Sequence, residues 1–250
     1  MAGKHRMMRQ FFIALQFLTR IPTPQLTDIS EEEAGRSLIF YPLVGLVIGI
    51  ILASIGWLFA DTSHNLQATL ILIAWIVITG GLHLDGLADS ADAWLGGHGD
   101  KERTLEIMKD AACGPAGAIA LIVALLIKYN TLLILGEQNN WLILIITPVI
   151  ARAAILVLFQ TTEYVRPSGL GTALAKHYSR NLGTVLLLCL AAGTILLLGY
   201  SGLILLSITL SVVLLMRWLM IRRIGGTTGD TAGAVVEIVE VVILLGATSI

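Results

Sequence analysis

The chain has 250 residues, of which 56% are hydrophobic and only 13% are charged, and its mean hydropathy is +0.85. A water-soluble domain of this length does not have such a composition, so we expect an integral membrane protein. The formal net charge of −1 gives no indication of a nucleic-acid partner.

The first 36 residues differ from the rest of the chain in being basic and only partly apolar. Residues 1–20 mix basic and apolar side chains, and Ile21-Pro22-Thr23-Pro24 and the acidic patch 31–33 follow without a small-residue cleavage site. This pattern is typical of an amphipathic helix that lies on the membrane, and not of a signal peptide.

Seven apolar windows follow, and each is close to the ~20 residues that a helix needs to cross a hydrocarbon core. They cover residues 38–59, 66–82, 114–135, 141–160, 182–199, 203–221 and 231–250, with the last two boundaries the least sharply marked. The sequence therefore predicts an all-α, polytopic membrane bundle with about seven transmembrane helices. We expect a single membrane domain over 1–250, of which residues 1–36 form the interfacial segment.

Lysine and arginine are concentrated in alternate connections between these windows. They lie before the first window, between the second and third, between the fourth and fifth, and near the sixth, whereas 61–65, 136–140 and 200–202 contain none. Because short loops rich in lysine and arginine stay in the cytoplasm, this predicts an N-terminus inside and a C-terminus outside. The two long connections, 84–113 and 161–181, would then be cytoplasmic loops where water-soluble chemistry takes place.

The first long connection contains three acids at helical spacing, Asp85, Asp89 and Asp92. We expect Gly80-Gly81 to loosen the helix, and residues 85–95 and 100–110 to form two further helices. On a helix the three acids share one face, where a cation or protonation must relieve their repulsion. Clustered aspartates favour a hard cation such as Mg²⁺ or Mn²⁺, which also accepts phosphate oxygens. Gly86 removes a side chain where a substrate could approach, and His83 is within reach; the alternative is a solvated helix face.

A second acidic stripe begins at the loop Gly225-Gly226-Thr227-Thr228-Gly229-Asp230 and continues at Glu237 and Glu240. Carboxylates inside a span are costly and usually face an interior cavity with a function. The alternative is an ion pair, for which Lys128 and Arg152 are available. The glycine-rich loop could offer backbone N–H groups to a phosphate, although this signal alone is weak.

These separated motifs resemble, in order and over essentially the whole chain, the cobalamin synthase family of adenosylcobinamide-GDP ribazoletransferases. The resemblance rests on Phe17-Leu18-Thr19-Arg20-Ile21-Pro22, Tyr41-Pro42-Leu43-Val44-Gly45, residues 81–89 with Asp92, residues 105–110 with Gly114 and Gly117, and residues 225–230 with Gly233, Ala234 and Glu237.

The resemblance implies an Mg²⁺-dependent membrane enzyme that joins adenosylcobinamide-GDP to α-ribazole or its 5′-phosphate and releases GMP. It implies a bacterial or archaeal cytoplasmic membrane, an active site facing the cytoplasm, and contact with membrane lipid. It leaves open a homo-oligomer or an association with other enzymes of the cobalamin pathway. We expect the metal ligands among Asp85, Asp89, Asp92, Asp110, Asp230 and Glu237, the catalytic groups among Asp85, His83 and Asp92, and the substrate contacts at Lys109, Arg103, Arg166, Gly226 and Thr228.

Three other functions are weighed against this one. CDP-alcohol phosphotransferases also use clustered aspartates on membrane helices, but their pattern requires an aspartate three residues before the Asp-Gly pair, where this chain has Leu82. A cation-coupled transporter would explain the intramembrane charges without catalysis. A membrane scaffold for pathway enzymes would tolerate Asp85→Asn.

Overall fold

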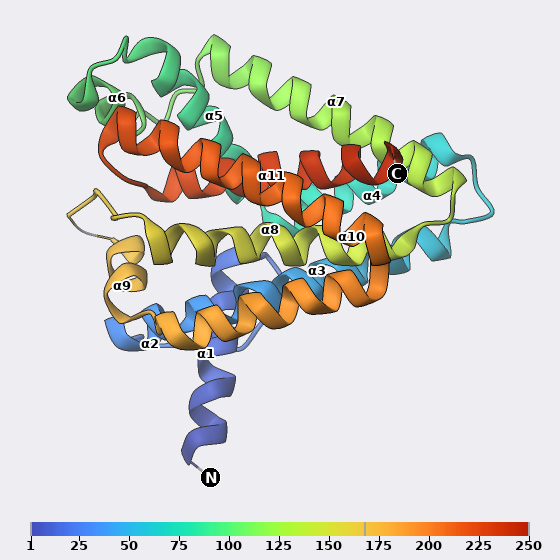
Figure 1. Ribbon diagram of the computed structural model, residues 1–250, viewed down its shortest axis with the longest axis horizontal. Helices are drawn as coiled ribbons and strands as arrows, with labels where there is room; N and C mark the ends of the chain where they lie inside the picture. The colour runs from blue at the N-terminus through green and yellow to red at the C-terminus, as the bar shows by residue number, and fades with distance from the viewer. Residues whose placement is uncertain (1, 168, 250) are drawn as a thin grey trace.

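The computed structural model describes residues 2–167 and 169–249, and these residues form a bundle of helices (Figure 1). Within these ranges there is no β-strand, only an isolated bridge between Tyr164 and Thr227. The α-helices are α1 (Ala2–Leu18), α2 (Glu31–Ser37), α3 (Tyr41–Leu58), α4 (His64–Thr79), α5 (Leu82–Gly96), α6 (Lys101–Ile107), α7 (Pro115–Glu137), α8 (Trp141–Thr161), α9 (Leu170–His177), α10 (Arg180–Ile224) and α11 (Gly229–Ser249), and a short 3₁₀ turn, Leu38–Phe40, links α2 to α3.

Within the described residues, five segments are long and apolar enough to cross a membrane, namely Glu31–Leu58, α7, α8, α10 and α11, and α4 with α5 forms a sixth, sharply bent candidate. α10 is itself interrupted at Gly199, which has φ 58° and ψ −132°, and its two arms fold back on each other (Figure 1). Each of the seven predicted windows therefore contains a helical segment, although 66–82 extends beyond α4 through the turn to the first residue of α5, and residue 250 of the last window lies outside the described residues. The predicted all-α class is confirmed. The number of crossings and their direction stay predictions.

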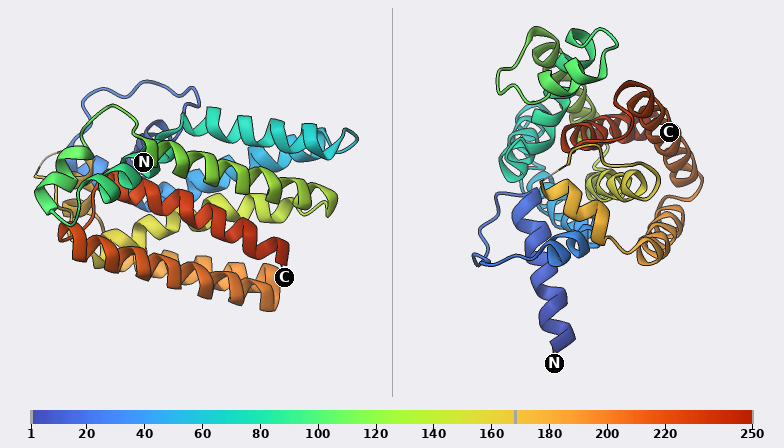
Figure 2. Two further views of the ribbon diagram at one scale, coloured as in Figure 1. Left: turned by 90° about the horizontal axis from the view of Figure 1, so that it is seen from above. Right: turned by 90° about the vertical axis from the view of Figure 1, so that its left-hand side faces the viewer.

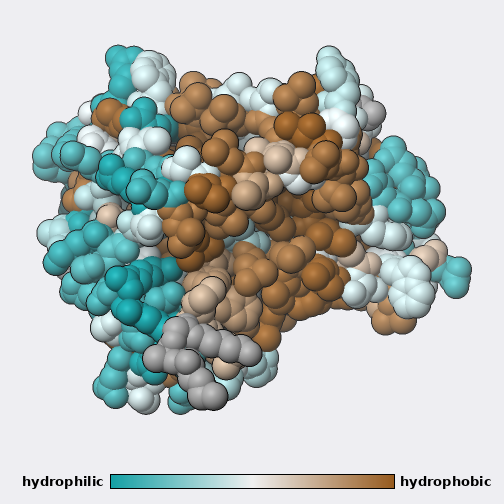
Figure 3. Space-filling view, turned by 60° about the horizontal axis from the view of Figure 1, so that its bottom comes forward, coloured by the Kyte–Doolittle hydropathy of each residue, from teal (hydrophilic) through white to brown (hydrophobic). Residues whose placement is uncertain are grey.

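The hydropathy of the surface changes along the long axis of the bundle. Figure 3 shows an apolar band between two polar ends, and large apolar side chains such as Leu196 and Trp57 are more than two-thirds exposed. Exposed apolar surface of this extent marks contact with an apolar medium, which for a bundle of long apolar helices is the bilayer. The predicted cytoplasmic loops gather at one end, together with α2, α6 and α9 (Figure 2).

The centre of the bundle is α8, which the other helices surround (Figure 2, right). α3 packs closely along it because Gly45 and Gly49 have no side chain. A Cβ at either position would collide with the backbone of α8 at Pro148 or Ile145. Small residues that let helix backbones approach are the usual means of packing helices where lipid removes the hydrophobic driving force.

Two consecutive glycines turn the chain sharply between α4 and α5. Gly80 and Gly81 both have left-handed backbone angles, with φ 62° and 69°, which cost glycine little. The axes of the two helices differ by 85°. The chain just after α1 lies against this turn, since the Arg20 N–H donates to the Ile78 carbonyl at 2.7 Å. As a result α5 runs across α11 at the polar end instead of continuing α4.

Candidate active site

The site begins where α5 crosses the first turn of α11. The crossing is close because a Cβ at Gly86 would lie 2.6 Å from the Asp230 carbonyl oxygen, whereas a Cβ at Gly233 would make only an ordinary van der Waals contact, 3.4 Å from the Cα of His83. The missing side chain of Gly86 therefore lets the helix of Asp85 lie against the helix of Asp230. The space that Gly86 leaves is filled by the backbone of α11, and not by a substrate.

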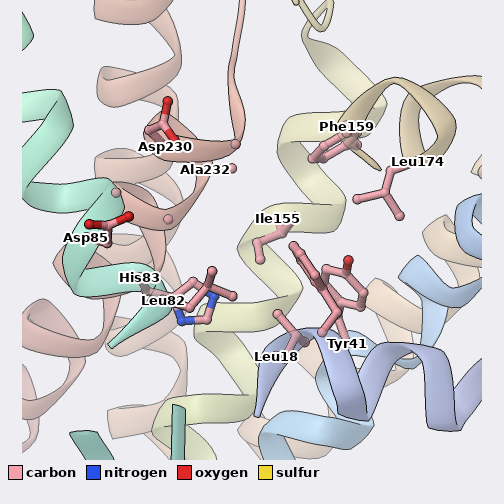
Figure 4. Close-up of a pocket in the computed structure, with 15 residues that line it drawn as sticks. Leu18, Tyr41, Leu82, His83, Asp85, Ile155, Phe159, Leu174, Asp230 and Ala232 are labelled. Carbon is pink, nitrogen blue, oxygen red and sulfur yellow. The ribbon is translucent and has the colours of Figure 1, made fainter. Parts of the chain in front are cut away.

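Asp85 and Asp230 line the same cavity, although 145 positions separate them in the sequence. Figure 4 shows both carboxylates on one side of it. The fold therefore brings together two of the expected metal ligands, one from each acidic motif.

Asp89 lies one helical turn beyond Asp85 on α5, outside the five long apolar helices. Burial and the negative charges of Asp85 and Asp230 raise the pKa of Asp89 to about 6, and the charge of Arg166 opposes this change. Carboxylates whose pKa is raised by their neighbours carry negative charge that the protein does not fully neutralise. This part of the site is suited to a cation.

Arg166 reaches the site from the loop between α8 and α9. The Thr227 N–H donates to Glu163 and the Val165 N–H donates to Thr227, at 2.8 and 3.0 Å, so this loop is fixed against the turn before α11. Arg166 Nη2 then lies 2.5 Å from Asp230 Oδ2. Of the predicted substrate-binding cations, Arg166 is the one that the fold brings to an aspartate of the site.

Asp92 has a different environment from Asp85. Its two carboxylate oxygens accept the N–H groups of Gly114, at 2.7 Å, and Gly117, at 2.9 Å. These N–H groups belong to the free amino-terminal end of α7, which favours a carboxylate. Asp92 therefore holds α7 against α5 with both of its oxygens.

Glu237 and Glu240 lie in the interior of the bundle, below Asp230 on α11. Lys128 Nζ contacts Glu237 at 2.6 Å and Glu240 at 2.5 Å, and Glu240 also pairs with Arg152. The ion-pair alternative is thus the arrangement that the structure contains, and it places Glu237 in a closed cluster of charges. Arg152 Nη2 also lies 3.4 Å from His83 Nδ1.

The contact with Arg152 determines what His83 can do. A guanidinium only donates hydrogen bonds, so Nδ1 of His83 accepts and the ring proton sits on Nε2. His83 is 3% exposed and lines the cavity beside Asp85. In this form it can donate a hydrogen bond into the cavity, but neither nitrogen is free to take a proton from a substrate.

Of the remaining predicted site residues, Thr228 contacts Asp230, since its hydroxyl donates to Asp230 Oδ2 at 3.4 Å, and the others are placed away from the two carboxylates or are engaged elsewhere. Arg103 pairs with Glu106 on exposed α6, and Lys109 and Asp110 are exposed. Gly226 allows close packing, because a Cβ there would collide with the Glu163 carbonyl. Thr228 is fully buried, and its N–H donates to Thr231 Oγ1 at 2.8 Å. The N–H groups of Thr227 and Thr228 are thus already bonded within the protein, to Glu163 and to Thr231.

Mg²⁺ suits this donor set, even though across residues 2–167 and 169–249 no three His, Cys, Asp or Glu side chains are arranged to hold a metal ion. Mg²⁺ is usually bound through one or two carboxylates, with waters and substrate phosphates supplying the rest. Asp85, Asp89 and Asp230 provide hard oxygen donors with incompletely neutralised charge. The residues therefore fit an ion that is completed by a phosphate substrate.

Comparison with known proteins supports the same family. The model of the family described as cobalamin-5-phosphate synthase matches residues 10–248. The chain belongs to this family.

Relatives in the cobalamin-5-phosphate synthase family are similar over nearly their whole length. An adenosylcobinamide-GDP ribazoletransferase of Pseudomonas fluorescens (strain Pf0-1) is 49% identical over 239 residues, which cover 96% of this chain and 98% of the relative. The enzyme of the same name from Pseudomonas syringae pv. syringae (strain B728a) is 50% identical over 238 residues, 95% of this chain and 98% of the relative. No solved structure matches. The chain is accordingly a membrane-embedded enzyme of cobalamin synthesis.

In this family member the cavity also has an apolar wall that the acidic motifs did not predict. Tyr41, Phe159 and Leu174 line it opposite the carboxylates (Figure 4), together with Leu18 and Ile155. Tyr41 is part of the motif Tyr41-Pro42-Leu43-Val44-Gly45, which carried the family resemblance without suggesting a role. Leu18 likewise belongs to the motif Phe17-Leu18-Thr19-Arg20-Ile21-Pro22, so these two motifs are the sequence signals that point to this wall.

Proposed function

We propose that the chain transfers the phospho-corrinoid of adenosylcobinamide-GDP to the 3′-hydroxyl of α-ribazole or its 5′-phosphate, in an Mg²⁺-dependent reaction that releases GMP. One observation carries the proposal beyond family membership. Asp85 and Asp230, from the two separate motifs, line one cavity at the polar end of a membrane bundle. A carboxylate pair of this kind suits a diphosphate substrate that requires a cation.

The reaction exchanges one oxygen for another at a single phosphorus atom. The 3′-oxygen of the ribazole forms a bond to the phosphorus that stays on the corrinoid, the bond from that phosphorus to the GMP oxygen breaks, and the hydroxyl proton leaves. Catalysis of such a transfer consists mostly of positioning and of neutralising charge on the transferred and leaving groups. Bound Mg²⁺ would supply much of that neutralisation.

The residues of the chain have separate tasks in this proposal. Asp85 and Asp230, which line the cavity, would hold the cation together with phosphate oxygens of the substrate, Asp89 adds negative charge beside them, and one of these carboxylates accepts the hydroxyl proton. Arg166, beside Asp230, offers a guanidinium to a phosphate oxygen. We leave Asp92 and Glu237 out of the ligand set because their oxygens are engaged with α7 and Lys128, and Asp110 because it is exposed, with an oxygen that accepts the Ala112 N–H.

The intramembrane charges, which were the reason to weigh a transporter, favour the enzyme more than transport. Lys128 pairs with Glu237 and Glu240, and Glu240 also pairs with Arg152, so the four side chains form one structural cluster. A transport pathway for cations would instead offer an open series of sites near mid-membrane.

The proposal is tested by mixing the purified protein, in lipid, with adenosylcobinamide-GDP, α-ribazole and Mg²⁺, and detecting GMP and the cobalamin product by mass spectrometry. Both products should appear together in a 1:1 ratio and disappear when EDTA is added. Release of GMP without the joined product would contradict the transfer, since it would indicate hydrolysis.

The first mutational prediction concerns Asp85. Asp85→Asn should lower product formation at least a hundredfold at saturating Mg²⁺, because the amide loses the negative charge that holds the cation, while the protein still inserts and unfolds at the wild-type temperature. Asp61→Asn, an exposed change in the connection between α3 and α4, is the matched control and should leave turnover unchanged. Wild-type turnover in Asp85→Asn would refute the role.

A further inference from the structure

The apolar wall of the cavity contains a polar group that has nothing to bind. Tyr41 is 1% exposed, and its hydroxyl has no hydrogen-bond partner in the described part of the chain. Leaving a buried hydroxyl unsatisfied is unfavourable. Because Tyr41 lines the cavity and its hydroxyl lies toward Phe159 and Leu174 (Figure 4), a ligand in the cavity is the natural partner.

The two walls of the cavity are chemically different. One contains the carboxylates of Asp85 and Asp230, and the other contains Tyr41, Phe159 and Leu174 (Figure 4). A molecule that contacts both walls needs an apolar, flat part at one end and hydroxyl groups at the other. A nucleoside with an uncharged aromatic base has this form.

The size of the cavity, about 210 Å³, selects among the substrates of the proposed reaction. A corrin ring with its side chains is several times larger than such a space, and it can only lie outside the cavity mouth. The guanosine diphosphate part carries negative charge and a base rich in polar groups, which the apolar wall would leave unpaired. α-Ribazole combines a benzimidazole base, with one unprotonated ring nitrogen, and a ribose.

We propose that this cavity is the binding site of the acceptor nucleoside, an inference that rests on the proposed function. The benzimidazole lies between Tyr41, Phe159 and Leu174, and the Tyr41 hydroxyl donates a hydrogen bond to the unprotonated ring nitrogen. The ribose lies on the side of Asp85 and Asp230, where its hydroxyl is to be deprotonated. His83, protonated on Nε2, is a second donor beside the ribose.

Tyr41→Phe tests the assignment because it removes only the unpartnered hydroxyl. Steady-state kinetics of the protein in lipid should show a KM for α-ribazole raised about tenfold, the loss of one hydrogen bond, and an unchanged KM for adenosylcobinamide-GDP. The melting temperature should be equal to or above that of the wild type, since no contact within the protein is lost. Tyr200→Phe, at a position that is 78% exposed, is the matched control and should change neither KM. Equal KM values for α-ribazole in Tyr41→Phe and wild type would overturn the assignment.

A binding measurement separates this inference from the proposed reaction. α-Ribazole alone, titrated into wild type and into Leu174→Trp, which fills the cavity, should bind the first and bind the second at least tenfold more weakly. Binding that Tyr41→Phe and Leu174→Trp both weaken, in a protein that forms no cobalamin product, would support the site and refute the reaction. Product formation with unweakened binding in both variants would refute the site alone. Displacement of α-ribazole by guanosine at equal concentration would also overturn the assignment, because it would show that the cavity binds the guanine base of the donor substrate.

Discussion

Asp92 has a structural role, although it belongs to the same acidic motif as Asp85 and Asp89. The N–H groups of Gly114 and Gly117 each donate to one of its oxygens, and a side chain at either glycine would collide with that carboxylate. The three residues form one unit that ties α5 to the start of α7. The contacts with Asp92 therefore explain why glycine is present at positions 114 and 117.

This assignment gives the second prediction. Asp92→Asn should lower the free energy of unfolding by about 1 kcal/mol, because the amide group can accept only one of the two N–H groups. It should keep the wild-type dependence of turnover on Mg²⁺ concentration. The measurements are chemical unfolding in detergent and an Mg²⁺ titration of activity, compared with Asp85→Asn. If Asp92→Asn greatly raises the Mg²⁺ concentration needed for the half-maximal rate, the structural role is contradicted and Asp92 is a metal ligand.

Part of the residue-level site follows from the sequence and part does not. The offsets of Asp85 and Asp89 and the second motif at Asp230 are visible because helical periodicity and carboxylate clustering are local properties. Gly86 was interpreted as space for a substrate, whereas it accommodates the backbone of α11. Which partner fills the space beside a glycine, or whether the hydroxyl of Tyr41 is paired, depends on segments far away in the sequence, and these cannot be predicted from spacing.

Among the helices, the contact of α7 with α11 is held by charges in the interior of the bundle. Lys128 of α7 lies between Glu237 and Glu240 of α11, and its Nζ is also 4.7 Å from the centre of the Trp75 ring on α4. A buried ion pair adds little net stability over an apolar pair, but the loss of one member leaves a charge without compensation. The cluster therefore fixes which helices pack together.

The third prediction follows from this cluster. Lys128→Met should lower the free energy of unfolding by about 3–5 kcal/mol, since it leaves Glu237 buried without a cation. Thermal and chemical unfolding in detergent measure the loss. The double variant Lys128→Met/Glu237→Gln should recover part of it, and Lys176→Met, at an exposed position of α9, should change stability by less than about 0.5 kcal/mol. A Lys128→Met protein as stable as wild type would contradict the structural role.

The helices could be predicted well and their turns poorly. Each of the seven apolar windows contains a helical segment, and the short helix expected at 100–110 is α6, because hydrophobic periodicity and capping are local signals. Gly80-Gly81 was expected only to loosen a helix, yet it turns the chain by 85°. The angle between two helices depends on what they pack against, and a glycine pair permits many angles.

For the whole molecule, the distribution of charge is what relates the bundle to its membrane. The basic connections and the proposed site share one polar end, and an apolar band separates it from the other end (Figure 3). If lysine and arginine mark the cytoplasmic side, both the substrates and the site lie in the cytoplasm.

The fourth prediction concerns this orientation, which the two cysteines allow to be tested directly. Cys113 is exposed in the connection between α6 and α7, and Cys189 is exposed on the apolar first arm of α10. A membrane-impermeant maleimide should label Cys113 in inside-out vesicles and not in right-side-out ones. Cys189 should react in neither, because it faces lipid. Cys113→Ser is the control, and labelling of wild type in right-side-out vesicles would reverse the predicted topology.

The left-handed pair Gly80-Gly81 has a consequence for how a membrane protein can offer charged groups to water-soluble molecules. Had α4 continued straight, Asp92 would stand about 18 Å further along the axis of α4, at 1.5 Å per residue from Gly80. The acids would then extend past α11 without a facing partner. Because Gly80 and Gly81 redirect the chain sideways, one continuous stretch first forms the apolar helix α4 and then places Asp85 of α5 in the same cavity as Asp230 of α11 at the polar end of the bundle.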